Sequence, residues 1–178
     1  MIYNILEGYD VVLKRLTEDK IELVRHWRND PKISKYMEFR DHITPDMQRA
    51  WFEKINNNDN YYFIIVYKGN EIGLINIKDI DWQIGQGESG SFIYDDKYLN
   101  TDIAYRAHIV LYDYFFNILK GKSLRAHILA DNNRSIRFSC FLGYKEVEKN
   151  QYILIDKDYF NNLNRSRFIK RWNKLYSK

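Results

Sequence analysis

One stretch, residues 88–144, constrains the fold more than any other because strand and helix patterns alternate along it. A strand at 89–94 leads through a polar loop into a long helix that begins at 100–102, where Thr and Asp side chains can accept hydrogen bonds from the first amides. Apolar residues then recur every three or four positions up to 118, which indicates one buried helix face. A strand at 124–130 and a helix ending at Gly143 follow. This order predicts two parallel strands joined by a right-handed crossover.

Composition excludes several classes of protein. A chain of 178 residues fits one domain with a real core, and its formal net charge of +4 is well short of a nucleic-acid-binding signature. The single cysteine, Cys140, excludes an internal disulfide, and no Cys or His spacing suggests a metal site. No apolar run has the length of a membrane span and no signal-peptide pattern is present, so we expect no membrane insertion and a cytoplasmic location.

The remaining elements follow from local patterns. Strands are predicted at residues 9–16, 61–67, 71–80, 145–149 and 152–156, and helices at 18–28, 33–37 and 44–55. Residues 68–70 form the turn of a hairpin. The expected fold is therefore α+β, with a mixed sheet of about seven strands flanked by helices.

Two segments carry a family resemblance. Residues 132–144 read as Asn, two residues, a small residue, and an apolar helix ending in Leu-Gly-aromatic, while residues 97–107 stand where a pyrophosphate loop is expected. With the order of elements over 11–156, these motifs resemble the GNAT superfamily of acyl-CoA-dependent N-acetyltransferases. The Arg-Ser-Ile-Arg run at 134–137 most resembles the branch with ribosomal-protein N-terminal acetyltransferases and amino-sugar acetyltransferases. The resemblance implies a sheet splayed at its centre and acetyl transfer from acetyl-CoA to a primary amine.

The resemblance also implies where acetyl-CoA binds. Amides at a helix start carry partial positive charge and can hold a pyrophosphate without basic side chains. The pantetheine arm is expected beside the strand before that helix. The cofactor-binding residues implied are Phe92, Ile93, Tyr94, Leu99, Asn100, Thr101, Asp102, Ile103, Ala104, Tyr105, Asn132 and Ser135.

Asp102 departs from the family pattern, which has a glycine there, and Leu99 replaces the usual Gln or Arg. A carboxylate at this position opposes pyrophosphate unless it turns outward as a helix cap. Two classes of function stay open on this ground: an active acetyltransferase, and a GNAT-fold module that has lost catalysis and serves binding.

The reaction implied is attack of a neutral amine on the thioester, which needs a base for the amine and an acid for the thiolate. Glu88 stands within one residue of the family's glutamate base, an offset that a bulge among Gly85, Gly87 and Gly90 would absorb. Ser139 stands where many relatives have a tyrosine acid. The alternatives are a solvated strand-edge glutamate and a serine that bonds its own helix backbone.

Other reactive side chains are expected to be structural. Cys140 is expected to be a small buried residue. Structural roles are also favoured for the four histidines, His26, His42, His108 and His127, because none has a partner at ligand or triad spacing.

The acceptor site is assigned to residues 26–37, which closely resemble the matching segment of acetyltransferases acting on nucleotide-linked 4-amino sugars of the pseudaminic-acid pathway. Aromatic rings can stack on a sugar or base, and an arginine can bind a diphosphate through two parallel hydrogen bonds. The candidate substrate-binding residues are Trp27, Arg28, Asn29, Tyr36 and Met37. N-terminal protein acetylation stays open, as does a purely packing role; a polyamine would need an acidic groove, which this basic segment does not offer.

Residues 157–178 extend past the domain expected at 1–156. The spacing of Phe160, Leu163, Phe168, Trp172 and Leu175 predicts an amphipathic helix, and the six charged residues from Arg165 onward are all basic. We expect its apolar side to pack on this domain or on a second subunit rather than on a membrane. A homodimer is left open.

Overall fold

The computed structural model describes residues 3–155 and 157–176, and it confirms an α+β fold with a mixed sheet that opens near its centre. Eight strands lie in the order β1-β2-β3-β4-β5-β6-β8-β7. They are β1 (Ile5–Gly8), β2 (Val11–Arg15), β3 (Tyr61–Tyr67), β4 (Asn70–Asp81), β5 (Gln86–Ile93), β6 (Ser123–His127), β7 (Lys145–Glu148) and β8 (Gln151–Ile155). Neighbouring strands are antiparallel except β5 and β6, which are parallel as predicted.

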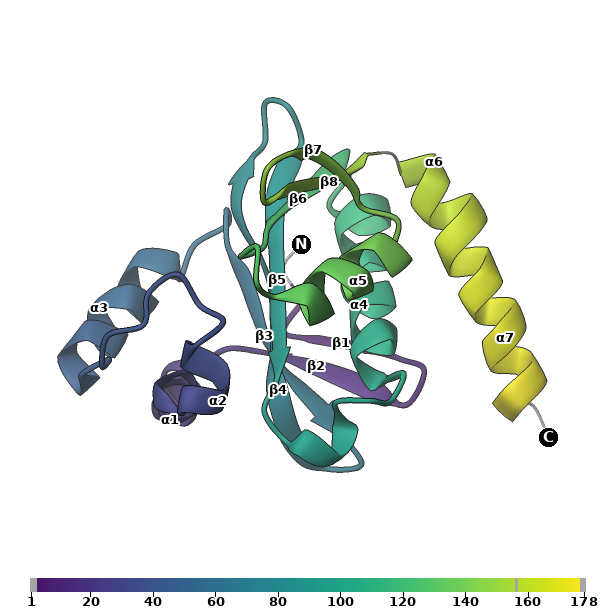
Figure 1. The fold of residues 1–178 in the computed structure, drawn as a ribbon. Coiled ribbons are helices and arrows are strands. Elements are labelled where there is room, and N and C mark those ends of the chain that lie inside the picture. Colours follow the sequence, from purple (N-terminus) through teal and green to yellow (C-terminus); the bar gives the residue numbers. More distant parts are fainter. Residues whose placement is uncertain (1–2, 156, 177–178) are drawn as a thin grey trace.

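Helices cover both faces of the sheet (Figure 1). They are α1 (Ile21–Asn29), α2 (Pro31–Ser34), α3 (Pro45–Ile55), α4 (Ile103–Asp113), α5 (Asn133–Phe141), α6 (Lys157–Tyr159) and α7 (Ser166–Tyr176), with 3-10 turns at η1 (Glu18–Lys20) and η2 (Asp96–Tyr98) and π-helical turns at η3 (Tyr114–Ile118) and η4 (Phe160–Arg165). The helices α1 to α3 lie on one face, and α4, α5 and α7 lie on the other. Among the residues described, no helix has both the length and the apolar character needed to cross a membrane.

The eighth strand, β1, was not predicted. The sequence analysis placed residues 9–16 in one strand, but Tyr9 and Asp10 form a tight turn with φ angles of 55° and 60°. This turn pairs β1 with β2. A two-residue turn with both φ positive usually contains Asn-Gly or Asp-Gly, and Tyr-Asp gives no such signal.

The sheet separates two apolar cores. Alternate residues of β3 point to opposite faces, so Phe63 packs toward α4 while Ile64 packs toward α1 and α3. Burial on both faces explains why β3 is apolar along its whole length.

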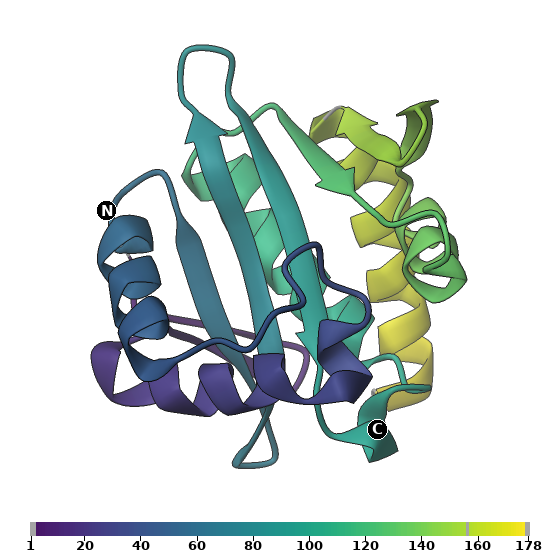
Figure 2. The ribbon, with the colours of Figure 1, turned by 60° about the vertical axis from the view of Figure 1, so that its left-hand side comes forward.

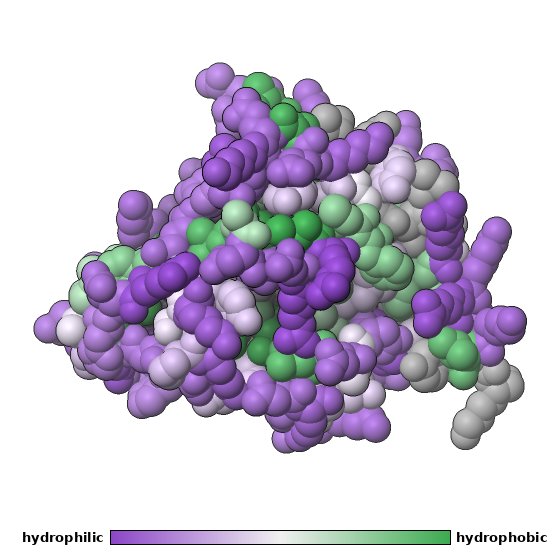
Figure 3. All heavy atoms as spheres, in the orientation of Figure 1, coloured by the Kyte–Doolittle hydropathy of each residue, from purple (hydrophilic) through white to green (hydrophobic). Residues whose placement is uncertain are grey.

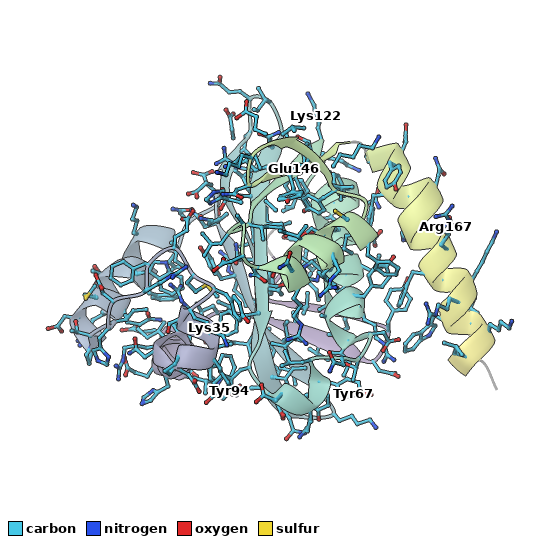
Figure 4. The ribbon with its side chains drawn as sticks, viewed as in Figure 1. Lys35, Tyr67, Tyr94, Lys122, Glu146 and Arg167 are labelled. Atoms are coloured by element: carbon cyan, nitrogen blue, oxygen red, sulfur yellow. The ribbon has the colours of Figure 1, made fainter. Side chains whose placement is uncertain are left out.

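The C-terminal helix α7 packs its apolar side against this domain, as expected. The Phe168 ring lies 4.8 Å from that of Tyr9 and 5.0 Å from that of Tyr105, measured between centroids. Arg167, labelled in Figure 4, is exposed on α7. The side chain of Leu163 and residue Lys178 lie outside the described part of the chain.

Candidate active site

Strands β5 and β6 are paired over only three residues of each, ending at Glu88 and Arg125. Beyond this pair, β5 continues beside β4 to Ile93, and β6 continues beside β8 to His127. The sheet therefore opens between residues 89–93 and residues 126–127, and we call this opening the split. In the view of Figure 3 most of the surface is hydrophilic, and apolar atoms are visible in the middle of this face, where Figure 1 draws β5.

The backbone of β5 presents alternate residues to the split. The Tyr94 amide donates to the Ile72 carbonyl at 2.7 Å, so Tyr94 uses its amide on the β4 side. Because the ladder alternates, Phe92 also bonds toward β4, while Ser91 and Ile93 turn their amides and carbonyls toward the split. Of the three residues predicted to bind pantetheine, only Ile93 therefore offers its backbone there. An extended amide-containing chain could pair with Ser91 and Ile93 as an added strand.

The start of α4 has amides available for an anion. The first bond within the helix runs from the Arg106 amide to the Asp102 carbonyl at 3.0 Å, which leaves the Ala104 amide without an acceptor in the helix. The Thr101 hydroxyl receives a long bond of 3.4 Å from the Ile103 amide. The arrangement fits a pyrophosphate held by a helix start.

Asp102 does not cap this helix with its side chain. Its carboxylate instead binds the Arg106 guanidinium at 2.7 Å, one turn further on. The Arg106 side chain is only 4% exposed and lies over the Trp172 ring, 4.2 Å from the ring centroid. The negative charge at the family's glycine position is therefore paired with a cation of the same helix.

Helix α5 is tied to the loop before α4. Asn132 caps α5 by accepting from the Ser135 amide at 3.1 Å. Arg134 donates to the Leu99 carbonyl at 3.0 Å and to Asn100 Oδ1 at 3.1 Å. Arg134 was not among the predicted site residues, although it belongs to the Arg-Ser-Ile-Arg run, and it connects the two predicted cofactor-binding segments.

Glu88 lies between two cations. Its carboxylate is 2.9 Å from Lys78 Nζ and 3.3 Å from Arg125 Nε, and its side chain is 20% exposed. Burial alone lowers the pKa of Lys78, but the bond to Glu88 and nearby negative charges outweigh it, so the Lys78 pKa is raised. The register irregularity lies on β4 between Lys78 and Asp81, not among the glycines of β5 as predicted.

Ser139 is buried on α5, and the Tyr144 amide donates to its carbonyl at 3.0 Å. The next residue, Cys140, is exposed, so the expectation that it is buried is wrong. Helix α5 is short and covers the sheet with one face only, and Cys140 lies on the outer face. A role for Ser139 as an acid stays a prediction.

Two of the predicted substrate-binding residues, Trp27 and Asn29, have side chains that are already used in contacts within the protein. The Trp27 ring is 4% exposed and stacks on Tyr94, with 5.5 Å between centroids (Tyr94 is labelled in Figure 4). Asn29 bonds both the amide and the carbonyl of Ile43, at 2.8 and 2.9 Å. These side chains hold α1 against the sheet and against the loop that follows α2. The other two flanking candidates, Tyr36 and Met37, lie on that loop, and the Tyr36 side chain is exposed.

Arg28 differs from its neighbours. Within the described part of the chain, its Nε atom is buried and has no hydrogen-bond partner. Burial lowers the pKa of Arg28, and it lies close enough to Tyr62 for their charges to interact. Phe92 and Tyr94 of β5 pack with the residues of α1, and by strand alternation Glu88 points to this same face of the sheet. A buried, unsatisfied guanidinium nitrogen is costly. Arg15 Nη1 is another such atom among the described residues, so Arg28 points to a ligand because it also lies in the predicted acceptor segment.

Behind β5, on the α4 side, lie two separate sets of side-chain hydrogen bonds that the sequence analysis did not identify. Ser89 and Tyr144 each hydrogen-bond the Tyr112 hydroxyl at 2.8 Å. His108 donates through Nδ1 to the Ala104 carbonyl at 2.7 Å and accepts from Ser91 at 3.2 Å, and burial lowers its pKa to about 4. His108 is therefore neutral, with the structural role expected for it, and it fixes the strand that borders the split.

A hollow of about 680 Å³ lies on the α1 face, beyond the end of β5. Three lysines and three carboxylates line it beside the Trp27 and Tyr94 rings; they are Lys14, Lys20, Lys32, Glu71, Asp95 and Asp96. Lys20 pairs with Glu71 at 2.7 Å, and Lys32 lies over the Tyr94 ring. Among the described residues, no group of three or more His, Cys, Asp or Glu side chains is arranged to hold a metal ion.

Comparison with known proteins gives consistent matches. A family model described as "Acetyltransferase (GNAT) domain" matches residues 10–145. Acetyltransferase PseH of Campylobacter jejuni is 23% identical over 147 residues, covering 80% of this chain and 83% of the relative. The structure of spermidine N-acetyltransferase from Vibrio cholerae, in complex with CoA and spermine, has a TM-score of 0.75 at 18% identity, covering 86% of this chain and 100% of the other. Apo FdhC, a nucleotide-linked sugar GNAT, has a TM-score of 0.77 at 18% identity, covering 96% and 98%.

Proposed function

The chain belongs to the GNAT acetyltransferases and is an acetyl-CoA-dependent N-acetyltransferase; from this premise we propose that its acceptor is the primary amine of a nucleotide-linked amino sugar. Acetyl-CoA supplies the acetyl group as a thioester. Two groups of residues in this structure fit acetyl-CoA. The Ala104 amide and its neighbours at the start of α4 suit the pyrophosphate. The backbone of Ser91 and Ile93 suits the amides of the pantetheine arm.

The acceptor assignment depends mainly on Arg28. Its buried Nε lacks a partner within the described part of the chain, on the face of the sheet opposite α4. A diphosphate would satisfy the guanidinium with charge-assisted hydrogen bonds. The similarity to PseH and to a nucleotide-sugar enzyme supports the same class of acceptor.

The runner-up acceptors fit less well. A polyamine is polycationic, whereas the cations Lys78 and Arg125 flank Glu88 on the acceptor side. The hollow on that face does not separate the acceptors, because its three lysines are matched by three carboxylates, Glu71, Asp95 and Asp96. A peptide N-terminus offers no phosphate for Arg28. A catalytically inactive binding module has two grounds in the sequence, Asp102 and the serine at the position of the tyrosine acid, and the first is weakened because Asp102 is paired with Arg106.

For the chemistry itself, Glu88 as base and Ser139 as acid remain proposals from sequence. Both carboxylate oxygens of Glu88 already have a cationic partner, Lys78 on one and Arg125 on the other. Ser139, on a helix that borders the split, would supply the proton that the departing thiolate needs.

An acceptor screen tests the proposal. The enzyme is incubated with acetyl-CoA and, separately, a UDP-linked 4-amino sugar, spermidine and short peptides, and released thiol is measured. We expect turnover of the nucleotide sugar at a kcat/KM at least tenfold above the others. Turnover of peptides alone would assign the chain to protein acetylation, and calorimetry that finds no CoA binding would support the inactive module.

A further inference from the structure

His127 contacts a residue far away in the sequence. Its Nδ1 hydrogen-bonds Oε1 of Glu38, which lies on the loop between α2 and α3. Figure 2 shows this loop crossing in front of the sheet toward β6. The contact therefore links the loop that follows the proposed acceptor segment to the strand on the far side of the split.

The strand β6 places His127 on the acceptor side of the split. Leu124 and Ala126 are buried in the core on the α4 side, so Arg125 and His127 point to the opposite face. Arg125 reaches Glu88 on that face, at the last residue pair before the strands part. His127 is the next residue of β6 on that face, and it lies at the edge of the split.

The parallel pair of Glu88 and Arg125 sets the register, so Gly90 on β5 lies opposite His127 across the split. Gly90 has no side chain of its own, and the Asn76 side chain of β4 lies close against it, since a Cβ there would come within 3.2 Å of Asn76 Oδ1. The His127 side chain is 28% exposed, so it is accessible to a reacting amine in the split.

The pairing with Glu38 gives this imidazole the features of a base. A carboxylate that accepts from Nδ1 fixes the ring orientation and leaves the Nε2 lone pair as the acceptor. Glu88, by contrast, is held between Lys78 and Arg125.

We propose that His127, oriented by Glu38, is the general base of acetyl transfer, in place of Glu88. The amine nitrogen attacks the thioester carbonyl and forms the C–N bond while its proton passes to Nε2 of His127. The C–S bond then breaks, and CoA leaves as the thiol after gaining one proton, so the products are an amide and CoA. This rests on the proposed reaction site at the split but not on the identity of the amine.

Three variants test the assignment: His127→Ala, His127→Asn and Glu38→Gln. The asparagine variant keeps an N–H that can donate to Glu38 but lacks Nε2. A loss of activity in this variant therefore comes from the missing base and not from a displaced loop. His42→Ala is the matched control, because His42 is an exposed histidine of the same loop as Glu38 and lies outside the proposed acceptor segment. Activity is followed with whichever primary amine the wild-type enzyme acetylates fastest, so a wrong sugar assignment changes the acceptor and leaves the comparison intact.

We expect both His127 variants to lose about 10²-fold or more in kcat. Their CoA affinity, measured by calorimetry, should stay within twofold of wild type, and added imidazole should restore part of the kcat of His127→Ala. Glu38→Gln should lose about tenfold without imidazole rescue. The proposal is overturned if either His127 variant keeps kcat within threefold of wild type, if imidazole restores nothing, or if Glu88→Gln loses more than His127→Asn.

Discussion

Asp102 and Arg106 form an ion pair on the first turn of α4, with 2.7 Å between a carboxylate oxygen and a guanidinium nitrogen. Arg106 is almost fully covered, partly by the Trp172 ring of α7. The C-terminal helix thus supports the cation that neutralises the carboxylate next to the proposed pyrophosphate site. A residue that looks incompatible with CoA from its sequence position is compatible once this partner is included.

Replacing Asp102 should destabilise the protein. Asp102→Asn leaves the Arg106 charge buried without its carboxylate, and because Asp102 itself is 43% exposed we expect a loss of about 1–2 kcal/mol in the free energy of unfolding. Asp46→Asn is the control, because its pair with Arg49 is 3.5 Å long and exposed, and it should change stability by less than about 0.5 kcal/mol. Equal effects in urea denaturation would show that the Asp102 pair contributes nothing beyond a surface ion pair.

Removing the Trp172 ring should loosen α7. The ring lies over Arg106 and 5.7 Å from the Tyr9 ring, so Trp172→Ala loses both apolar packing and the cation–π contact. We expect a loss of about 2 kcal/mol, below the cost at a fully buried site because the residue is half-buried. Leu175→Ala, on the same helix but 58% exposed, is the matched control and should stay near wild type. If the two variants unfold at the same urea concentration, α7 does not depend on this contact.

The buried His108 should make the fold sensitive to mild acid. Burial lowers its pKa from an ordinary 6.5 to about 4. Between these pH values the histidine is protonated in the unfolded chain and neutral in the folded protein, which lowers the free energy of unfolding. The penalty is absent above pH 6.5, grows as the pH falls, and stops growing below pH 4. Between pH 7.5 and pH 5 it amounts to about 2 kcal/mol.

The comparison of wild type with His108→Gln isolates this effect. Glutamine carries a donor and an acceptor but no titrating group, so its free energy of unfolding should fall less over the same pH interval. Urea denaturation of both proteins at the two pH values gives the difference directly. A wild-type loss no greater than that of the variant would mean that His108 binds its proton as readily in the folded protein.

Features written locally in the sequence were predicted well. The helix α3 begins where Thr44 and Pro45 predict, and the Thr44 hydroxyl accepts from the Met47 amide at 3.2 Å. The hairpin of β3 and β4 turns at Lys68 and Gly69, both with positive φ. Caps and turns depend on a few adjacent residues, so they can be predicted without knowing how the rest of the chain folds.

The roles of site residues were harder to predict because they depend on distant partners. Trp27 and Asn29 look like ligand-binding side chains, but the stack with Tyr94 and the bonds to Ile43 use them inside the protein. The pair of His127 with Glu38 joins residues 89 apart in the sequence, and no spacing rule brings them together. Only the fold shows which polar groups are already satisfied and which are not.

Arg28 is the residue on which the nucleotide-sugar proposal depends most directly. If its unsatisfied guanidinium binds the acceptor's diphosphate, Arg28→Ala should raise the KM for the sugar nucleotide about tenfold or more, because a lost charge-assisted hydrogen bond costs about 1.5–3 kcal/mol. Arg28→Lys should recover only part of this, since an ammonium group cannot form the planar pair of bonds. CoA affinity should stay unchanged in both variants, because CoA is expected on the other side of the sheet. Arg49→Ala, which removes an exposed arginine of the nearby helix α3, is the control and should leave the KM as it is. A KM that is unchanged in Arg28→Ala, with the fold intact by circular dichroism, would remove the phosphate contact and with it the main support for a nucleotide-linked acceptor.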